Sequence, residues 1–499
     1  MAGQSRKWMI LVATIWIQAF TGTNFDFSAY SSEMKAILGV SQVQLNYLAT
    51  ASDLGKAVGW SSGLALMWMP LWAVMFTAAV MGLIGYGAQY LVVTNVIALP
   101  YFVVFLLCLL AGCSICWFNT VCFVLCIKNF PSNRPLALAL TVSFNGVSAA
   151  LYNLAVNSLN PSSSAVYLLL NALIPLFTSV VALIPILRQP VVDPVASDLV
   201  RRDQLTFLKL NLLAVITGLY LVFLHPSNSL TACLLFAGAI FLLILPLGVP
   251  GIIYARDWFK RTIYSSFRLD GSGFILVDAE DLELHKELLS RPNSVANGLT
   301  TDSANIDGQK NGSDESCSCA GVIKNDQLVM LGEEHKAGML VRRKVYFART
   351  GWLAIALLPT PIAFFFLGAF GGDSLAVQAG TALIGLSSGF IFAAAISITS
   401  ELFGPESVGV NHNILITNIP IGSLVYGFLA AMVYDSNAAS RVGRMADSVV
   451  CMGRNCYFWT FVSWGCISLL GLGSSVLLFL RTRPAYHRFE QSRRSTMLS

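Results

Sequence analysis

The chain has 499 residues, of which 56% are hydrophobic and only 11% are charged. An average soluble domain carries about 25% charged residues, so this composition excludes a soluble globular enzyme, a disordered chain and a secreted disulfide scaffold. It is typical of a chain that uses lipid as its solvent. The formal net charge is +5, and its distribution along the chain is more informative than its sum.

Apolar runs of about 18 residues or more, the length that crosses a hydrocarbon core, predict the helices. Twelve runs meet this criterion, and the second and eleventh are the most polar. In chain order they cover residues 8–29, 43–67, 71–94, 99–127, 135–157, 165–187, 207–224, 230–254, 345–370, 375–399, 407–434 and 457–480. The sequence therefore predicts an all-α polytopic membrane protein with about 12 transmembrane helices.

The positions of lysine and arginine predict the orientation of these helices. If the N-terminus is cytosolic, 26 of the 31 lysines and arginines fall on the cytosolic side and four fall outside. Cytosolic loops are enriched in these residues, so both termini are expected in the cytosol, as an even number of spans also requires. Seven residues precede the first span, so no transit peptide is expected, and the plasma membrane is the favoured location.

Loop lengths divide the chain into parts. A six-helix bundle is expected over residues 8–187, a cytosolic linker over 188–206, two further helices over 207–254, a four-helix part over 345–480 and a basic cytosolic tail over 481–499. Residues 255–344 are rich in Ser, Asn, Asp, Gly and Lys, which predicts a cytosolic and largely disordered loop. An unstructured linker is favoured there over a docking segment for a cytosolic partner.

Polar side chains inside the predicted spans are few, and each is expensive in lipid. Thr14, Gln18, Gly22 and Asp26 are spaced by four, so they lie on one face of the first helix and form a polar stripe. The stripe predicts contact with the bundle interior or with a water-filled cavity. The alternative is that Asp26 lies at the membrane interface and touches water.

The second span carries a pair of opposite charges beside a row of glycines. Asp53 and Lys56 are three residues apart and can pair on one helix face. The neighbouring ridge consists of Gly55, Gly59 and Gly63, a spacing that lets another helix approach closely. The charges are therefore expected to point into protein. They form either a proton or substrate site or, as the favoured alternative, a structural ion pair that locks two helices.

The eleventh span carries amide groups. Asn411, Asn418 and Tyr426 fall close together on one face, which predicts an inward-facing surface because amides need partners in lipid. Pro420 is expected to break this helix within the span, as in the broken helices that line substrate sites of transporters. His412, near the helix start, is expected to be interfacial.

The remaining motifs point away from catalysis. The eleven cysteines form no metal-binding pattern, and no metalloprotease motif, phosphate loop or nucleophile elbow is present. The sequence therefore predicts no enzyme, no metal, no cofactor and no nucleic-acid partner. Cys451 and Cys456 lie in a predicted outer loop, where a disulfide and two free thiols are equal alternatives.

Four segments resemble plant nodulin-like proteins of the nuclear-fusion-defective type, a group within the major facilitator superfamily. They are residues 7–35, 52–63, 70–91 and 400–430, and the resemblance extends over nearly the whole chain outside the long loop. It implies a major-facilitator-like bundle of two pseudo-symmetric halves around a central cavity, with alternating access, and it implies no particular substrate. Members of the group usually carry an additional helix pair before the segment at 345–352, so the second half of this chain is expected to be incomplete.

These observations predict a membrane transporter-like protein that moves an unidentified small solute, with a proton as one candidate for the coupling ion. The candidates for the substrate or ion pathway are Gln18, Asp26, Asp53, Lys56, Asn411, Asn418 and Tyr426. The alternative is a non-transporting membrane scaffold or regulator, because loss of a helix pair would abolish the transport cycle.

Overall fold

The computed structural model describes residues 2–159, 163–188, 197–224, 226, 228–264, 268–270, 273–275, 349–402, 408–439 and 456–498. These residues are almost all helical. In the described part of the chain the strands are β1 (Arg268–Asp270) and β2 (Gly273–Ile275), which pair as a small antiparallel hairpin. Ten helices among the described residues are long and apolar enough to cross a membrane. The predicted all-α polytopic fold is confirmed.

The first six expected spans are all helical, although several are interrupted. In chain order they form α1 (Ala2–Thr21), η1 (Thr23–Asp26), α2 (Phe27–Leu38), α3 (Gln42–Ala57), α4 (Trp60–Ala65), α5 (Leu71–Val93), α6 (Tyr101–Asn129), η2 (Pro131–Asn133), α7 (Arg134–Asn145), α8 (Ser148–Leu159) and α9 (Ala165–Leu187).

Twelve spans were expected, but only ten described helices are long and apolar enough to be membrane spans. The segments expected at 8–29 and 43–67 are not among these ten helices. The first is interrupted at Gly22 between α1 and η1, and the second is divided into the more polar helices α3 and α4. Both nevertheless pack inside the bundle, since α1 contacts α6, α7 and α9, and α3 contacts α6.

Besides β1 and β2, the described residues after α9 form ten further helical elements. They are α10 (Ser197–Phe223), α11 (Ser229–Ile244), η3 (Leu245–Leu247), α12 (Gly248–Tyr264), α15 (Arg349–Leu357), α16 (Pro359–Phe370), α17 (Ser374–Leu402), α18 (Val408–Ile416), α19 (Asn418–Ala439) and α20 (Phe458–Leu498).

Three expected boundaries are corrected, because helices run beyond the apolar segments that predicted them. α10 begins inside the expected linker 188–206, α12 continues into the expected loop 255–344, and α20 runs through the expected tail 481–499 as far as Leu498. Extending an existing helix is far easier than starting one, so a helix can continue into polar sequence outside the hydrocarbon core. Most of the loop, and residues 345–348 of the expected ninth span, lie outside the described residues.

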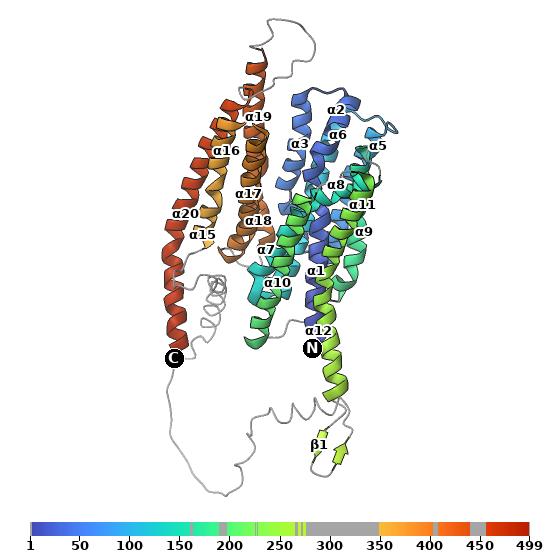
Figure 1. Ribbon diagram of the computed structural model, residues 1–499, viewed down its shortest axis with the longest axis vertical. Coiled ribbons are helices and arrows are strands. Elements are labelled where there is room, and N and C mark those ends of the chain that lie inside the picture. The colour runs from blue at the N-terminus through green and yellow to red at the C-terminus, as the bar shows by residue number, and fades with distance from the viewer. Residues whose placement is uncertain are drawn as a thin grey trace, which may run out of the picture.

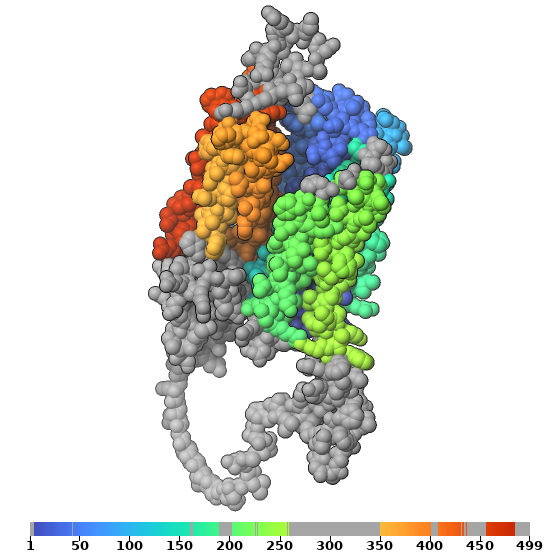
Figure 2. Space-filling view, in the orientation of Figure 1, coloured from blue at the N-terminus to red at the C-terminus, as the bar shows by residue number. Residues whose placement is uncertain are grey.

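The helices form two groups that stand side by side, with both termini at the same end of the molecule (Figure 1). The N-terminal group contains α1 to α12, and the C-terminal group contains α15 to α20. They touch where α3 and α4 meet α19 and α18, and where α7 meets α17. Figure 2 shows a furrow between the C-terminal helices, in orange and red, and the N-terminal helices, in blue and green.

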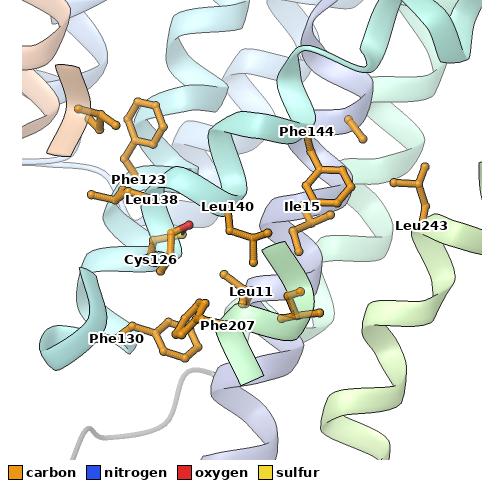
Figure 3. Close-up of a cluster of buried hydrophobic side chains, with 14 of the residues drawn as sticks. Leu11, Ile15, Phe123, Cys126, Phe130, Leu138, Leu140, Phe144, Phe207 and Leu243 are labelled. Atoms are coloured by element: carbon orange, nitrogen blue, oxygen red, sulfur yellow. Dashed lines mark hydrogen bonds between the residues drawn. The ribbon is translucent and has the colours of Figure 1, made fainter. Parts of the chain in front are cut away.

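A buried aromatic cluster attaches α10 to the first bundle. Trp8 of α1, Phe130 directly after α6 and Phe207 of α10 have ring centroids 4.9–5.1 Å apart. Phe130 and Phe207 are seen together in Figure 3. Beside them the Nζ atom of Lys7 lies 2.5 Å from Oδ2 of Asp203, and it also lies over the Phe130 ring. A lysine in this apolar surrounding needs a counter-charge, and the start of α10 provides it.

Glycines let α3 and α6 approach each other closely. A Cβ atom on Gly55 would lie 1.9 Å from the carbonyl oxygen of Leu109, and one on Gly112 would lie 1.8 Å from the carbonyl oxygen of Ser52. Both distances are far below van der Waals contact, so the two backbones touch. Small residues at such crossings let membrane helices pack without any hydrophobic driving force between them.

Replacing Gly112 by alanine is therefore expected to separate α3 from α6. Overpacking of this kind destabilises proteins by about 1–3 kcal/mol or more, so Gly112→Ala should lower the melting temperature of the purified protein in detergent. Gly427→Ala is the matched control, because no heavy atom lies within 4 Å of a Cβ placed at Gly427. Equal melting temperatures for the two variants would contradict the close approach.

Candidate functional site

The polar stripe of α1 faces protein. Thr14, Gln18 and Asp26 are 0%, 1% and 3% exposed. At the fourth position, a Cβ on Gly22 would lie 2.6 Å from the carbonyl oxygen of Asn145, so α1 meets the end of α7 there without a side chain between them. The spacing by four along the sequence thus becomes a continuous buried face from Thr14 to η1.

Gln18 is the centre of a chain of three amides from three helices, which we call the amide chain. Its Nε2 atom donates a hydrogen bond of 2.9 Å to Oδ1 of Asn119 on α6, and its Oε1 atom accepts one of 2.9 Å from Nδ2 of Asn145 on α7. Gln18 is buried, whereas Asn119 and Asn145 are half-buried.

The two ends of the amide chain keep unused hydrogen-bonding capacity. Each amide has a carbonyl oxygen and an NH₂ group, and Gln18 uses only the oxygen of Asn119 and only the NH₂ group of Asn145. One donor group and one acceptor are thus presented by half-buried side chains. Such a pair can bind a neutral polar solute in a fixed orientation.

Asp26 lies in a second buried polar position, on η1. Its Oδ2 atom is buried without a hydrogen-bond partner, as are both polar atoms of the Asn171 side chain on α9, with which the carboxyl group interacts. Nearby, the Thr23 hydroxyl donates a hydrogen bond of 2.7 Å to the Tyr86 hydroxyl. Buried polar atoms without partners are rare in proteins, so this buried polar group is a candidate site for a proton or a water molecule.

The predicted charge pair forms on α3. The Nζ atom of Lys56 lies 2.7 Å from Oδ1 of Asp53, and the two side chains are 12% and 22% exposed. Because both residues belong to one helix, the ion pair itself does not join two helices. The glycine ridge makes that contact instead, since Gly59 packs on Cys116 of α6 and Gly63 packs on Val410 of α18.

The eleventh span is interrupted as expected, although the break lies three residues before Pro420. The helix is interrupted at Thr417, between α18 and α19, and Pro420 is the third residue of the new helix. Proline is tolerated in the first turn of a helix because the N–H group that it lacks would have no partner there.

The interruption also separates the expected face of Asn411, Asn418 and Tyr426. Asn411 is half-buried and Asn418 is exposed. The Tyr426 ring packs against Trp464 of α20, with the ring centroids 5.5 Å apart. The pattern assumed one continuous helix, and the turn at Thr417 changes the direction in which the second part presents its side chains.

The amide that joins the two groups of helices is Asn413, which sequence reasoning missed. Asn413 is 1% exposed, and its Nδ2 atom lies 2.8 Å from Thr120 Oγ1, 3.2 Å from Ser62 Oγ and 3.1 Å from the Gly59 carbonyl oxygen. It also contacts the Gly409 carbonyl oxygen at 2.7 Å. We call these five residues the Asn413 junction. It adjoins the amide chain, because Thr120 follows Asn119 on α6.

The histidine next to it is not interfacial as expected. His412 is 5% exposed, and its ring packs edge-on against Phe123 of α6, with centroids 5.4 Å apart. The start of α18 lies against α4 and α6 rather than at the surface of the bundle, which is why the neighbouring histidine is buried.

The cysteine pair expected in the outer loop can be placed only in part. Cys456 is fully buried and disulfide-bonded. Cys451 lies outside the described residues, so the pairing of the two stays a prediction. In the described part of the chain, no group of three or more His, Cys, Asp or Glu side chains could hold a metal ion.

Comparisons with known proteins identify the family. Residues 7–251 match the Nodulin-like family model, and residues 324–488 match the model of the NFD4 C-terminal domain. The chain is 51% identical to Protein NUCLEAR FUSION DEFECTIVE 4 of Arabidopsis thaliana over 556 residues, which cover 99% of this chain and 92% of that protein. The chain belongs to the nodulin-like family. The resemblance found in the sequence is thereby confirmed.

The alignment with the Arabidopsis protein also shows a difference in length. It runs over 556 residues, whereas this nodulin-like chain has only 499. The Arabidopsis protein therefore contains residues that have no counterpart here. Their number, at least 57 from these two lengths, is sufficient for two membrane-spanning helices of about 20 residues each.

Further similarities are more distant. The chain is 40% identical to the Probable transporter MCH1 of Yarrowia lipolytica (strain CLIB 122 / E 150) over 85 residues, 17% of each chain. Its structure is similar to the major facilitator superfamily proton:xylose symporter XylE, with 11% identity, 95% and 96% of the two chains covered and a TM-score of 0.45. It is also similar to the human organic anion transporter MFSD10 (TETRAN), with 12% identity, 95% and 97% covered and a TM-score of 0.42.

Asn413→Asp is expected to weaken the Asn413 junction. The substitution keeps the shape of the side chain but places a carboxylate oxygen against the carbonyl oxygens of Gly59 and Gly409. The loss of these buried hydrogen bonds should destabilise the protein by about 1–3 kcal/mol, measurable as a lower melting temperature in detergent. Asn418→Asp, at an exposed position, is the control. Equal melting temperatures for the two variants would show that the Asn413 junction does not hold the two groups of helices together.

Proposed function

We propose that this nodulin-like protein is a secondary transporter of a small polar solute, which binds at the amide chain. The observation that carries the proposal is the arrangement of Gln18, Asn119 and Asn145. These three amides come from three helices of a bundle of membrane-spanning helices. Lipid cannot satisfy amides, so such a set is stable only where it faces protein, water or a solute. Its free donor and acceptor are suited to hydroxyl, amide or carbonyl groups of the solute.

Alternating access is supported by the division of the helices into two groups. Each group has its own packing, and the main contacts between them join α3, α4 and α6 to α18 and α19, and α7 to α17. The Asn413 junction lies in that contact and consists of hydrogen bonds to an amide rather than interhelical ion pairs. Hydrogen bonds of this kind can break and re-form as the groups rock about the bound solute.

Asp26 is the proposed site for a coupling proton. Carboxyl groups inside membrane proteins are costly, and in pumps and transporters they mark proton relays. The Asp26 carboxyl group has a buried oxygen without a partner, faces Asn171, and lies on the same helix face as Gln18. Solute binding at Gln18 on α1 and proton binding at Asp26 on η1 would thus act on two consecutive parts of the same predicted span.

Uptake into proteoliposomes tests the proposal. The full-length protein is reconstituted with an imposed pH gradient and given a panel of labelled sugars, amides and other small polar metabolites. Gln18→Leu should lower the uptake rate about tenfold or more, because it leaves Asn119 and Asn145 without their partner. Asp26→Asn should abolish acceleration by the pH gradient, because an amide cannot carry the proton. Gln378→Leu, the same change at an exposed position of α17, should leave uptake unchanged.

A negative result has a defined meaning in this assay. No uptake of any solute by this chain, alongside uptake by the longer Arabidopsis protein under the same conditions, would overturn the proposal. It would favour the non-transporting scaffold or regulator, because the residues that the Arabidopsis protein has in addition would then be needed for transport.

A further inference from the structure

A groove about 350 Å³ in volume lies between α1, α9 and η3. This falls within the range of roughly 300–1,000 Å³ that is typical of small-molecule pockets. Its walls are mainly apolar and include Met9, Val12 and Trp16 of α1 and Val181 and Ile184 of α9. We call it the α1–α9 groove.

The groove exists because the additional helices α11 and α12 pack outside the six-helix bundle, against α1. The Ser5 hydroxyl donates a hydrogen bond of 2.9 Å to the Pro250 carbonyl oxygen, and Trp16 Nε1 donates one of 2.7 Å to the Leu243 carbonyl oxygen. These bonds hold α1 to η3 and its flanking helices, so the face of α1 next to α9 becomes a recess. Ile184, on the opposite wall, is 62% exposed and would meet lipid in a membrane.

Two positive charges lie at one end of this apolar recess. Arg6 precedes the apolar part of α1, and Arg188 follows Leu187, the last residue of α9. Both arginines are exposed and line the groove, and no acidic residue is among its lining residues. Among the described residues neither has a hydrogen-bond or ion-pair partner. At the ends of membrane helices such side chains reach the level of the lipid headgroups.

We propose that the α1–α9 groove binds an anionic phospholipid. The phosphate group lies between Arg6 and Arg188, whose guanidinium groups match its oxygens, and an acyl chain follows the apolar wall past Met9 and Ile184. Charge complementarity selects an anionic headgroup, because the groove carries two cations and no carboxylate. The apolar wall selects a lipid over free phosphate. Lipid binding in this groove does not require that the protein transports a solute.

Native mass spectrometry of the delipidated full-length protein tests this site. Phosphatidylglycerol is the anionic probe and phosphatidylcholine is the neutral one. Each basic residue near a membrane surface contributes about fivefold to the binding of anionic lipid, so the preference for phosphatidylglycerol should be about tenfold or more. The doubly substituted Arg6→Ala/Arg188→Ala protein should lose that preference.

Two further variants separate the groove from general electrostatics. Ile184→Trp keeps both charges but fills the acyl-chain part of the groove, so it should also weaken phosphatidylglycerol binding. Lys128→Ala/Arg481→Ala removes the same charge from exposed positions outside the groove, and this protein should still bind phosphatidylglycerol. Melting temperatures are measured in parallel, so that a misfolded variant is recognised and replaced by the charge-conserving Arg6→Lys/Arg188→Lys protein, which should bind weakly because lysine lacks the forked geometry.

Three results would overturn the proposal. Equal binding of the two lipids by the unmodified protein would exclude charge selection. An equal loss in the control pair would show that the total charge, and not this groove, attracts the lipid. Undiminished binding by Ile184→Trp together with competition by inorganic phosphate would show a phosphate site without a lipid site.

Discussion

Hydrocarbon offers no hydrogen-bond partners, so an amide or carboxyl group within a span is stable only where protein, water or a solute surrounds it. That constraint fixes the position of α1. Thr14 and Gln18 lie on a single face of α1, Asp26 follows in η1, and all three are buried. If α1 were rotated by half a turn, these groups would meet acyl chains. The amide chain, the burial of Asp26 and the approach of Gly22 to α7 all follow from the same orientation.

The contact between the two groups of helices follows a different rule. Glycines and one amide replace charges there, because small residues allow close approach and an amide provides hydrogen bonds at a lower desolvation cost than an ion pair. Gly63 packs against α18, and Asn413 donates to groups on α4 and α6. Such a contact is suited to repeated opening. The Arabidopsis relative contains additional residues that have no counterpart in this chain.

Hydropathy and spacing predicted the helical segments and the inward face of α1, because each depends on local sequence alone. Three features depend on the folded chain and were missed. Lys7 and Asp203 are 196 positions apart, so no local pattern links them. Asn413 lies off the face on which the amides of the eleventh span were expected to gather, and the turn at Thr417 invalidates that face. The polar ends of the helices were also not predicted, because apolar runs indicate the part of a helix in the hydrocarbon core and not the full length of the helix.

The most direct test of the central claim is the accessibility of the amide chain to water. In a chain whose Cys233, Cys317, Cys319 and Cys466 are serine, a cysteine is introduced by Asn145→Cys or by Phe177→Cys, the latter at a position that is 68% exposed on the outer face of α9. A water-soluble thiol reagent is applied to the protein in its membrane. Labelling of Asn145→Cys without labelling of Phe177→Cys is the predicted result. Labelling of Phe177→Cys alone would show that the polar face is closed to water and that α9 faces solvent, which would contradict the account.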